Sequence, residues 1–292
     1  ADMVCELPVY GALGSAEIFA ESAVSLLNQL GCIDFLCFGA ETIDPHLFHA
    51  IVSVLSDEPP EYRTLLQDAL KTGMNFPAAR SYALGRLLKN THCSHILNLP
   101  NNILAIEYMK TIHRQNLKLT PSVVTRNGAG YHDTDTDTEL ASASALRKFI
   151  FQDTSDQKNN FDTLNQMLTR TVPDSVRELL LTAYESHAFL QEDDFSDLLY
   201  YELQRQLLHP TASDADTTRS DLTQRIANKL ESFTCWSEFV SDLKTKNQTY
   251  TAISRYLLHA LLGIDGELLN AAKTYYYAPY ARILGFRKDA SP

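Results

Sequence analysis

The first forty residues combine short apolar runs with one helical stripe. Residues 3–7 form an apolar run that Pro8 ends, which predicts a buried strand. Between residues 15 and 30 the apolar positions recur at helical spacing, and Gly31 follows as a C-terminal stop. Residues 33–38 form a second buried run. A strand, a helix and a strand joined by short links predict a parallel crossover, and therefore an α/β sheet.

The pattern then becomes mainly helical. Residues 45–90 predict helices that break at Pro59–Pro60 and turn at Gly73–Pro77. A helix is predicted from about Ile103 to Asn116, because its apolar residues share one stripe. Residues 119–125 predict a further strand.

Strand signals nearly vanish in the second half. A loop rich in glycine and aspartate at 127–139 precedes a helix predicted from about Ser142 to Phe151. Two amphipathic helices are then expected, around residues 195–207 and 222–233. The pattern predicts an α/β domain followed by an α-helical domain.

The expected domains cover residues 1–150 and 151–292. Because a domain rarely begins on a buried core strand, we expect the front strands of the sheet to be missing from this chain.

Composition and cysteine usage are those of a globular protein in a reducing compartment. Of 292 residues, 45% are hydrophobic and 21% charged, and neither a membrane-spanning run nor a signal peptide is visible. The five cysteines form no CxxC pair, and most lie in apolar surroundings, so we expect buried free thiols and a cytoplasmic location. The acidic string 133–139 lacks the glycine and the distant glutamate of an EF-hand loop, so no protein metal site is predicted.

Charge is unevenly distributed along a chain whose net charge is −11. Residues 151–218 hold 4 Lys or Arg against 13 Asp or Glu, whereas residues 244–292 hold 7 against 3. Such asymmetry is able to guide a polyanion to one face, and chance variation on solvated helices is the alternative interpretation.

A glycine turn after the third predicted strand is one candidate ligand site. Arg126 and Asn127 precede Gly128 and Gly130, and ligands of open α/β sheets bind beyond the carboxyl ends of the strands. The guanidinium of Arg126 is suited to phosphate. An ordinary turn with a solvated arginine is the alternative.

Further candidates lie at predicted helix starts and at one strand end. Ser142, Ser144 and Arg147 open a helix, where free N–H groups attract anions, although an ordinary serine cap explains them equally. Asn101 also opens a helix, and an N-cap is again the simple alternative. Gly39 closes a strand, where the backbone is able to approach a nucleotide closely or simply to turn.

Several short motifs occur together in a recognisable order. They are ADMVCELP at 1–8, SAEIFA at 15–20, FGAE at 38–41, PNNIL at 100–104, GAGYHD at 128–133, SASALR at 142–147 and YARILGF at 280–286. This series resembles the bacterial tRNA(Met) cytidine acetate ligase family of the nucleotidyltransferase superfamily, over nearly the whole chain.

The resemblance implies a Rossmann-like parallel-sheet nucleotidyltransferase domain and a defined reaction. Enzymes of this family join acetate and ATP, with Mg²⁺, into acetyladenylate and pyrophosphate. They then pass the acetyl group to the wobble cytidine of elongator tRNA(Met). By resemblance, Gly39, Asn101 and Arg126 with its neighbour Asn127 fall at ATP-contacting positions. Ser142 to Arg147, with Ser144 between them, resembles the second phosphate motif of the superfamily.

The resemblance also implies an HxGH loop that grips the triphosphate, and these 292 residues contain no HxGH motif. The resemblance therefore identifies no catalytic residue in this chain, and we expect weak ATP binding and poor catalysis.

The basic region near the C-terminus is the candidate tRNA contact. Lys244, Lys246 and Arg255 surround a helix start predicted at Thr249, and Tyr250 offers a stacking surface. Solvated helix faces are the alternative. Two other functions stay open: a nucleotidyltransferase that acts on a small molecule, and a non-catalytic helical binding module.

Overall fold

Two strands that are distant in sequence form the parallel pair on which the first helices pack. β2 (Phe35–Ala40) pairs with β3 (Thr120–Thr125), and the Thr120 N–H donates to the Asp34 carbonyl at 2.8 Å where both strands begin. The computed structural model describes residues 2–42, 44–125, 143–151, 157–208, 217–246 and 248–288. Within these residues the predicted α/β fold with a small parallel sheet is confirmed.

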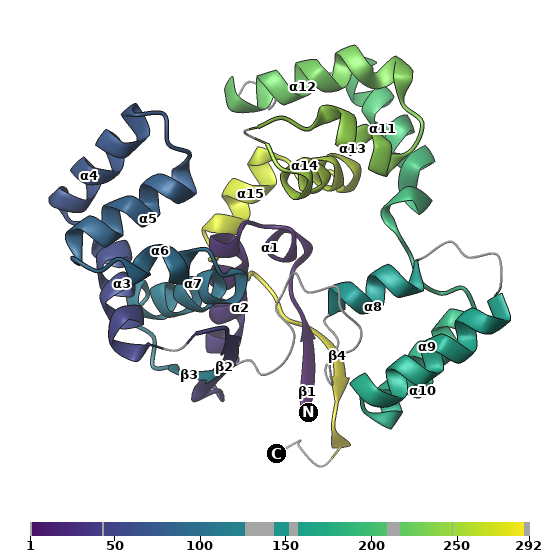
Figure 1. Cartoon of the computed structure of the whole chain (residues 1–292), viewed down its shortest axis with the longest axis horizontal. Helices are drawn as coiled ribbons and strands as arrows, with labels where there is room; N and C mark the ends of the chain where they lie inside the picture. The colour runs from purple at the N-terminus through teal and green to yellow at the C-terminus, as the bar shows by residue number, and fades with distance from the viewer. Residues whose placement is uncertain are drawn as a thin grey trace. The chain divides into compact units, whose positions relative to one another are not determined.

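β1 has a different partner from the one that the sequence predicts. β1 (Met3–Glu6) pairs antiparallel with β4 (Arg282–Phe286), and the register shifts between Val4 and Cys5 (Figure 1). In the described residues β1 and β2 therefore belong to different sheets, and the parallel crossover predicted between them is wrong. Opposite charges match the two strands, since Arg282 bridges Glu6 at 2.9 Å. All five residues of β4 are exposed, so no alternation of burial marked it as a strand.

Seven helices are described before β3, and the last of these packs directly on β2. They are α1 (Val9–Ala12), α2 (Ala16–Gln29), α3 (Pro45–Asp57), α4 (Pro60–Lys71), α5 (Phe76–Leu87), α6 (His92–Leu97) and α7 (Pro100–Arg114). The predicted boundaries of α2 are confirmed, because Ser15 caps its start and Gly31 takes φ of +71° after its end. α7 begins three residues before the predicted start.

The buried core of this half is built mainly on α3, α5, α6 and α7. Phe48, Ile51, Leu84 and Ile106 are among its least exposed side chains. A second apolar cluster joins α2 to β2 and the end of α7. Both clusters hold α7 against the parallel strands, which places the first turn of α7 next to the end of β2.

The last hundred residues form a helical cluster that packs around one tryptophan. Its helices are η1 (Glu192–Phe195), α11 (Ser196–Leu208), α12 (Thr217–Lys229), η3 (Leu230–Ser232), α13 (Trp236–Leu243) and α14 (Tyr250–Leu262). The next helix, α15 (Gly266–Lys273), belongs to a separate apolar cluster that contains Tyr10. Trp236, Phe239, Ile253 and Leu257 are almost fully buried. The two predicted amphipathic helices are confirmed as α11 and α12.

The chain divides into two compact units. The first contains Ala1–Val124 and Glu192–Pro292, and the second contains Thr125–Gln191. The second unit holds α8 (Ala143–Ile150), α9 (Gln157–Thr171) and α10 (Asp174–Glu185). The boundary expected at residue 150 falls inside the second unit.

The cysteines are less buried than the sequence suggested. All five are free, but only Cys93 is buried, while Cys32 and Cys37 are exposed. The prediction is wrong for Cys37 because the run that contains it is a strand covered on one face, with Leu36 and Ala40 buried and Cys37 on the other side. Among the described helices, none is long and apolar enough to cross a membrane.

Candidate functional site

The carboxyl end of β2 meets the first turn of α7 through one carboxylate. Glu41 follows β2 directly. Its Oε1 accepts the backbone N–H of Asn101 at 3.1 Å and the side-chain amide of Asn101 at 2.7 Å. Its Oε2 accepts the backbone N–H of Asn102 at 2.9 Å. One side chain therefore satisfies two free N–H groups of the helix start.

Asn102 forms hydrogen bonds in the opposite direction, from α7 to the chain that follows β2. Its Oδ1 accepts the backbone N–H groups of Glu41 at 3.0 Å and of Thr42 at 3.3 Å. We call this reciprocal set of five hydrogen bonds the Glu41–Asn102 clamp. Asn102 is fully buried, and its Nδ2 has no acceptor among the described residues. Buried donors are nearly always paired, so this nitrogen stands out among the described side chains as an unmatched donor.

The clamp changes the role expected of Asn101 at the helix start. The N-cap residue is Leu99, which offers no side-chain hydrogen bond, and Pro100 occupies the first helical turn. The capping that a sequence pattern assigns to asparagine is performed by Glu41, from sixty residues away. Its negative charge also lies where the helix dipole favours an anion.

Gly39 and Asn101, two of the predicted nucleotide contacts, lie on β2 and α7, the two elements that the clamp joins. Gly39 lies on the exposed face of β2, two residues before Glu41, and Asn101 is half-buried. β3 runs parallel to β2 and ends at Thr125 on the same edge. Arg126, Asn127 and Ser142 lie outside the described residues.

The remaining phosphate candidates belong to the second unit. Ser144 is half-buried and Arg147 is exposed on α8, the helix predicted from about Ser142. The helix is confirmed, while an anion site at its start remains a prediction.

Behind the clamp, α7 carries an ion-pair network that sequence reasoning missed. Glu107 is 3% exposed and bridges Arg80 of α5 at 2.8 Å, and it also pairs with Lys110. Lys110 is 8% exposed and reaches Glu17 of α2 at 2.8 Å. Burial by itself would raise the pKa of Glu17, but the hydrogen bond and charge of Lys110, together with Arg114, hold that pKa below its usual value. The network ties α7 to both neighbouring helices.

The residues predicted to contact RNA differ in their exposure and in the contacts that they already make. Lys244 and Lys246 are exposed, and Arg255 is half-buried on α14, whose start at Thr249 is confirmed. Tyr250 packs against the tryptophan cluster, and its hydroxyl donates to Glu192. Burial, followed by the hydrogen bond and charge of Glu192, raises the pKa of Tyr250. Its ring thus already has a structural role in the helical cluster.

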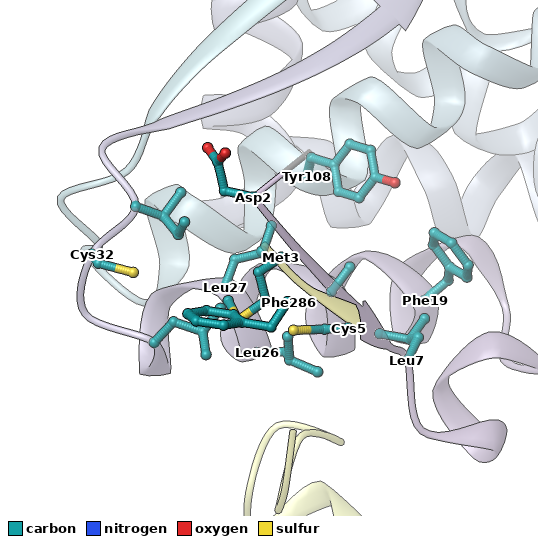
Figure 2. A pocket seen from close by; sticks show the side chains of 13 residues that line it. Asp2, Met3, Cys5, Leu7, Phe19, Leu26, Leu27, Cys32, Tyr108 and Phe286 are labelled. Atoms are coloured by element: carbon teal, nitrogen blue, oxygen red, sulfur yellow. The ribbon is translucent and has the colours of Figure 1, made fainter. Parts of the chain in front are cut away.

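One hollow of about 630 Å³ lies between the β1–β4 ribbon and α2 (Figure 2). Met3, Leu7, Phe19, Leu27 and Phe286 are among the labelled side chains that line it. Its lining is mostly apolar, with Asp2 as its carboxylate, so it offers few groups for chemistry. Among the described residues, no group of three or more metal-ligating side chains is found.

Comparison with known proteins agrees with the geometry. The sequence model of the family described as HIGH Nucleotidyl Transferase matches residues 1–291. The tRNA(Met) cytidine acetate ligase of Clostridium perfringens strain SM101 is 34% identical over 98% of this chain and 68% of its own length. The chain belongs to the tRNA(Met) cytidine acetate ligase family. The family member of Acetivibrio thermocellus is 30% identical, over the same shares of the two chains.

A solved structure shows the same fold. Thermotoga maritima TmcAL in its apo form superposes with a TM-score of 0.84 at 24% identity, over 99% of this chain and 67% of that chain. The same protein bound with alpha-thio ATP gives a TM-score of 0.81 at 23% identity, over 99% and 66%. Glu41 and Asn102 are the members of the site to which sequence reasoning gave no role. In the sequence, Glu41 follows Gly39 by two residues and Asn102 follows Asn101, so both lie beside residues that were already candidates.

Proposed function

We propose that this chain acts in the ATP-dependent acetylation of the wobble cytidine in elongator tRNA(Met), in the cytoplasm. The observation that carries the proposal is the match to named tRNA(Met) cytidine acetate ligases over 98% of the chain. The polar corner at the end of β2 supports it, because ligands of parallel α/β sheets bind beyond the carboxyl ends of the strands. Among the described residues of the site, no feature favours a small-molecule nucleotidyltransferase instead.

The corner suits the nucleoside part of ATP better than its phosphates. Glu41 already places a negative charge at the start of α7, where a phosphate would otherwise bind. That charge repels a triphosphate, whereas a carboxylate and an asparagine amide pair well with ribose hydroxyls and the adenine amine. Gly39, with no side chain, lets a ring lie close to the strand end.

The phosphates then require cationic and donor groups from elsewhere. We assign them to Arg126, Asn127, Ser142, Ser144 and Arg147, on the family resemblance. Mg²⁺ would enter with ATP, since Mg²⁺ is usually held by substrate phosphates and water molecules with only one or two protein carboxylates. Acetate attacks the α-phosphate, and pyrophosphate leaves as acetyladenylate forms.

The tRNA would contact the basic surface formed by Lys244, Lys246 and Arg255. Two of these side chains are exposed, and in the described residues no carboxylate bridges any of the three. Contacts of this kind hold RNA phosphates without reading sequence. Tyr250, with its hydroxyl on Glu192, helps to fix the start of the helix that carries Arg255.

The direct test is nucleotide binding to the corner, because binding is measured without the complete reaction. Amide chemical shifts are followed while adenosine, AMP and ATP are titrated. Asn101→Ala should weaken all three by a similar factor, about three- to tenfold for one lost neutral hydrogen bond. Asn28→Ala, at an exposed position of α2, is the matched control.

Acetate-dependent exchange of pyrophosphate into ATP, followed by transfer of labelled acetate to tRNA(Met), tests the reaction itself. An Asn101→Ala effect that appears only with ATP would instead place the phosphates at the corner. Equal binding by wild type and Asn101→Ala would remove Asn101 from the site.

A further inference from the structure

A second hollow, of about 530 Å³, opens between α5 and α6. One wall is a stripe on α5 formed by Ala78, Tyr82 and Arg86, which are spaced four residues apart and therefore share a helix face. Ser94 and Asn98 of α6 line it as well, again four residues apart. The volume lies within the roughly 300–1,000 Å³ range of small-molecule sites.

The chemistry of this hollow is mixed rather than apolar. Tyr82 is 44% exposed, and within the described part of the chain neither its hydroxyl nor the side-chain amide of Asn98 makes a hydrogen bond. The Arg86 guanidinium is exposed, and no described carboxylate bridges it. An aromatic face, a free cation and a free amide therefore converge on one opening.

The hollow also lies in the longest acid-free part of a strongly acidic protein. No Asp or Glu occurs between Asp68 and Glu107, although the chain contains 36 of them. Within that stretch Arg80 is neutralised by Glu107, which leaves Arg86 and Lys89 as unbridged charges among the described residues. Arg86 and Lys89 therefore have no acidic neighbours in sequence, and uncompensated positive charge attracts a polyanion.

We propose that the hollow formed by Ala78, Tyr82, Arg86, Ser94 and Asn98 binds one unpaired nucleotide of an RNA. The base stacks on Tyr82, the amide of Asn98 pairs with its edge, and Arg86 holds the adjoining phosphate. Asn98 lies three residues before Asn101, so the bound nucleotide is close to the corner assigned to ATP. The inference rests on the proposed function for its substrate class and extends it to residues outside that site.

The test compares a short RNA hairpin carrying the anticodon loop of tRNA(Met) with a fully paired duplex of equal length and charge. Binding is measured by fluorescence anisotropy at several salt concentrations. Tyr82→Leu should weaken hairpin binding about fivefold or more, the lower end for a lost base stack, and should leave duplex binding unchanged. Tyr82→Phe keeps the ring and should restore hairpin affinity.

Two further variants separate charge from shape. Arg86→Gln should weaken the hairpin and flatten its salt dependence, whereas Arg63→Gln on α4, an equal loss of charge beside Glu58, should do neither. Ala78→Trp fills the hollow without altering charge and should also block the hairpin. Free CMP is expected to bind far more weakly than the hairpin, since it lacks the adjoining phosphates.

Each contrary result points to a different error. Hairpin binding that survives both Tyr82→Leu and Ala78→Trp, or no hairpin binding by the wild type, overturns the proposed hollow. Equal losses for hairpin and duplex reduce it to a charged surface and overturn the stacking. Titrations of the same variants with adenosine and ATP test the proposed function separately. If the variants lost as much affinity for ATP as for the hairpin, the hollow would be assigned to ATP.

Discussion

The carboxylate of Glu41 holds both the backbone and the side-chain amide of Asn101, at 3.1 and 2.7 Å, although the two residues are sixty positions apart. The end of a strand and the start of a helix are thus joined by one side chain. Because Asn102 returns two hydrogen bonds to the same strand end, the joint is fixed from both sides. A ligand that contacts Asn101 therefore meets an amide whose position is already set.

The first prediction concerns the stability of this joint. Glu41→Ala should lower the free energy of unfolding by about 1–3 kcal/mol, because it leaves half-buried donors of α7 without an acceptor. Glu41→Gln keeps one oxygen and should cost less. Urea unfolding at neutral pH measures both.

A double-mutant cycle of Glu41→Ala with Asn102→Ala supplies the control. The two changes should be non-additive by about 0.5–3 kcal/mol, the range for residues within one hydrogen-bond network. Additive losses would show that the two sides of the clamp act independently.

The second prediction concerns the buried pair on α7. Glu107→Leu leaves Lys110, 8% exposed, with only the more exposed Glu17, and should cost about 3–5 kcal/mol, the range for a buried pair that loses one partner. Glu107→Leu combined with Lys110→Met should be less damaging than Glu107→Leu alone, because no buried ammonium is left. A double variant that is less stable than the single one contradicts this account.

The third prediction concerns pH. The pKa of Glu17 is lower in the folded chain than its usual value of 4.5, so its stabilising effect is present above that value and is lost as the pH falls through the folded pKa. The stability difference between wild type and Glu17→Gln should therefore shrink in acid. Urea unfolding at pH 7 and at pH 4 measures it.

Glu21, one turn further on α2, is the matched control. Burial and then the charge of Glu17 raise its pKa, so its charged form opposes folding at neutral pH. Glu21→Gln should be stabilising at pH 7, and this advantage should fade as the pH falls. If both variants changed the stability at pH 7 in the same direction, the ion pair with Lys110 would not be what separates the two carboxyl groups.

The fourth prediction concerns the basic surface near the C-terminus. Replacing Lys244, Lys246 and Arg255 together by Ala should weaken tRNA(Met) binding and reduce its salt dependence, because fewer counterions are released. A control variant with Arg63, Lys118 and Arg170 replaced by Ala loses the same charge elsewhere. Filter binding at several salt concentrations compares them, and equal slopes for the two variants would exclude a local contact.

Local physical chemistry was sufficient to predict much of this protein from sequence. Apolar periodicity located α2, α11, α12 and both parallel strands, since helical and strand spacing are properties of the backbone. Proline and glycine marked the ends of α3 and α4 for the same reason. The order of short motifs was enough to indicate the family. Strand-end and helix-start rules proposed Gly39 and Asn101 as nucleotide contacts, and that assignment stays a prediction.

What joins distant segments was decided only by the tertiary structure. All five residues of β4 are exposed, so only its pairing with β1 identifies it as a strand. Glu41 carries no local sign that it caps a helix sixty residues later, and Glu107 gives none that it will be buried between Arg80 and Lys110. A sequence pattern reports the periodicity of one segment, whereas a carboxylate takes its role from the donors that folding places around it.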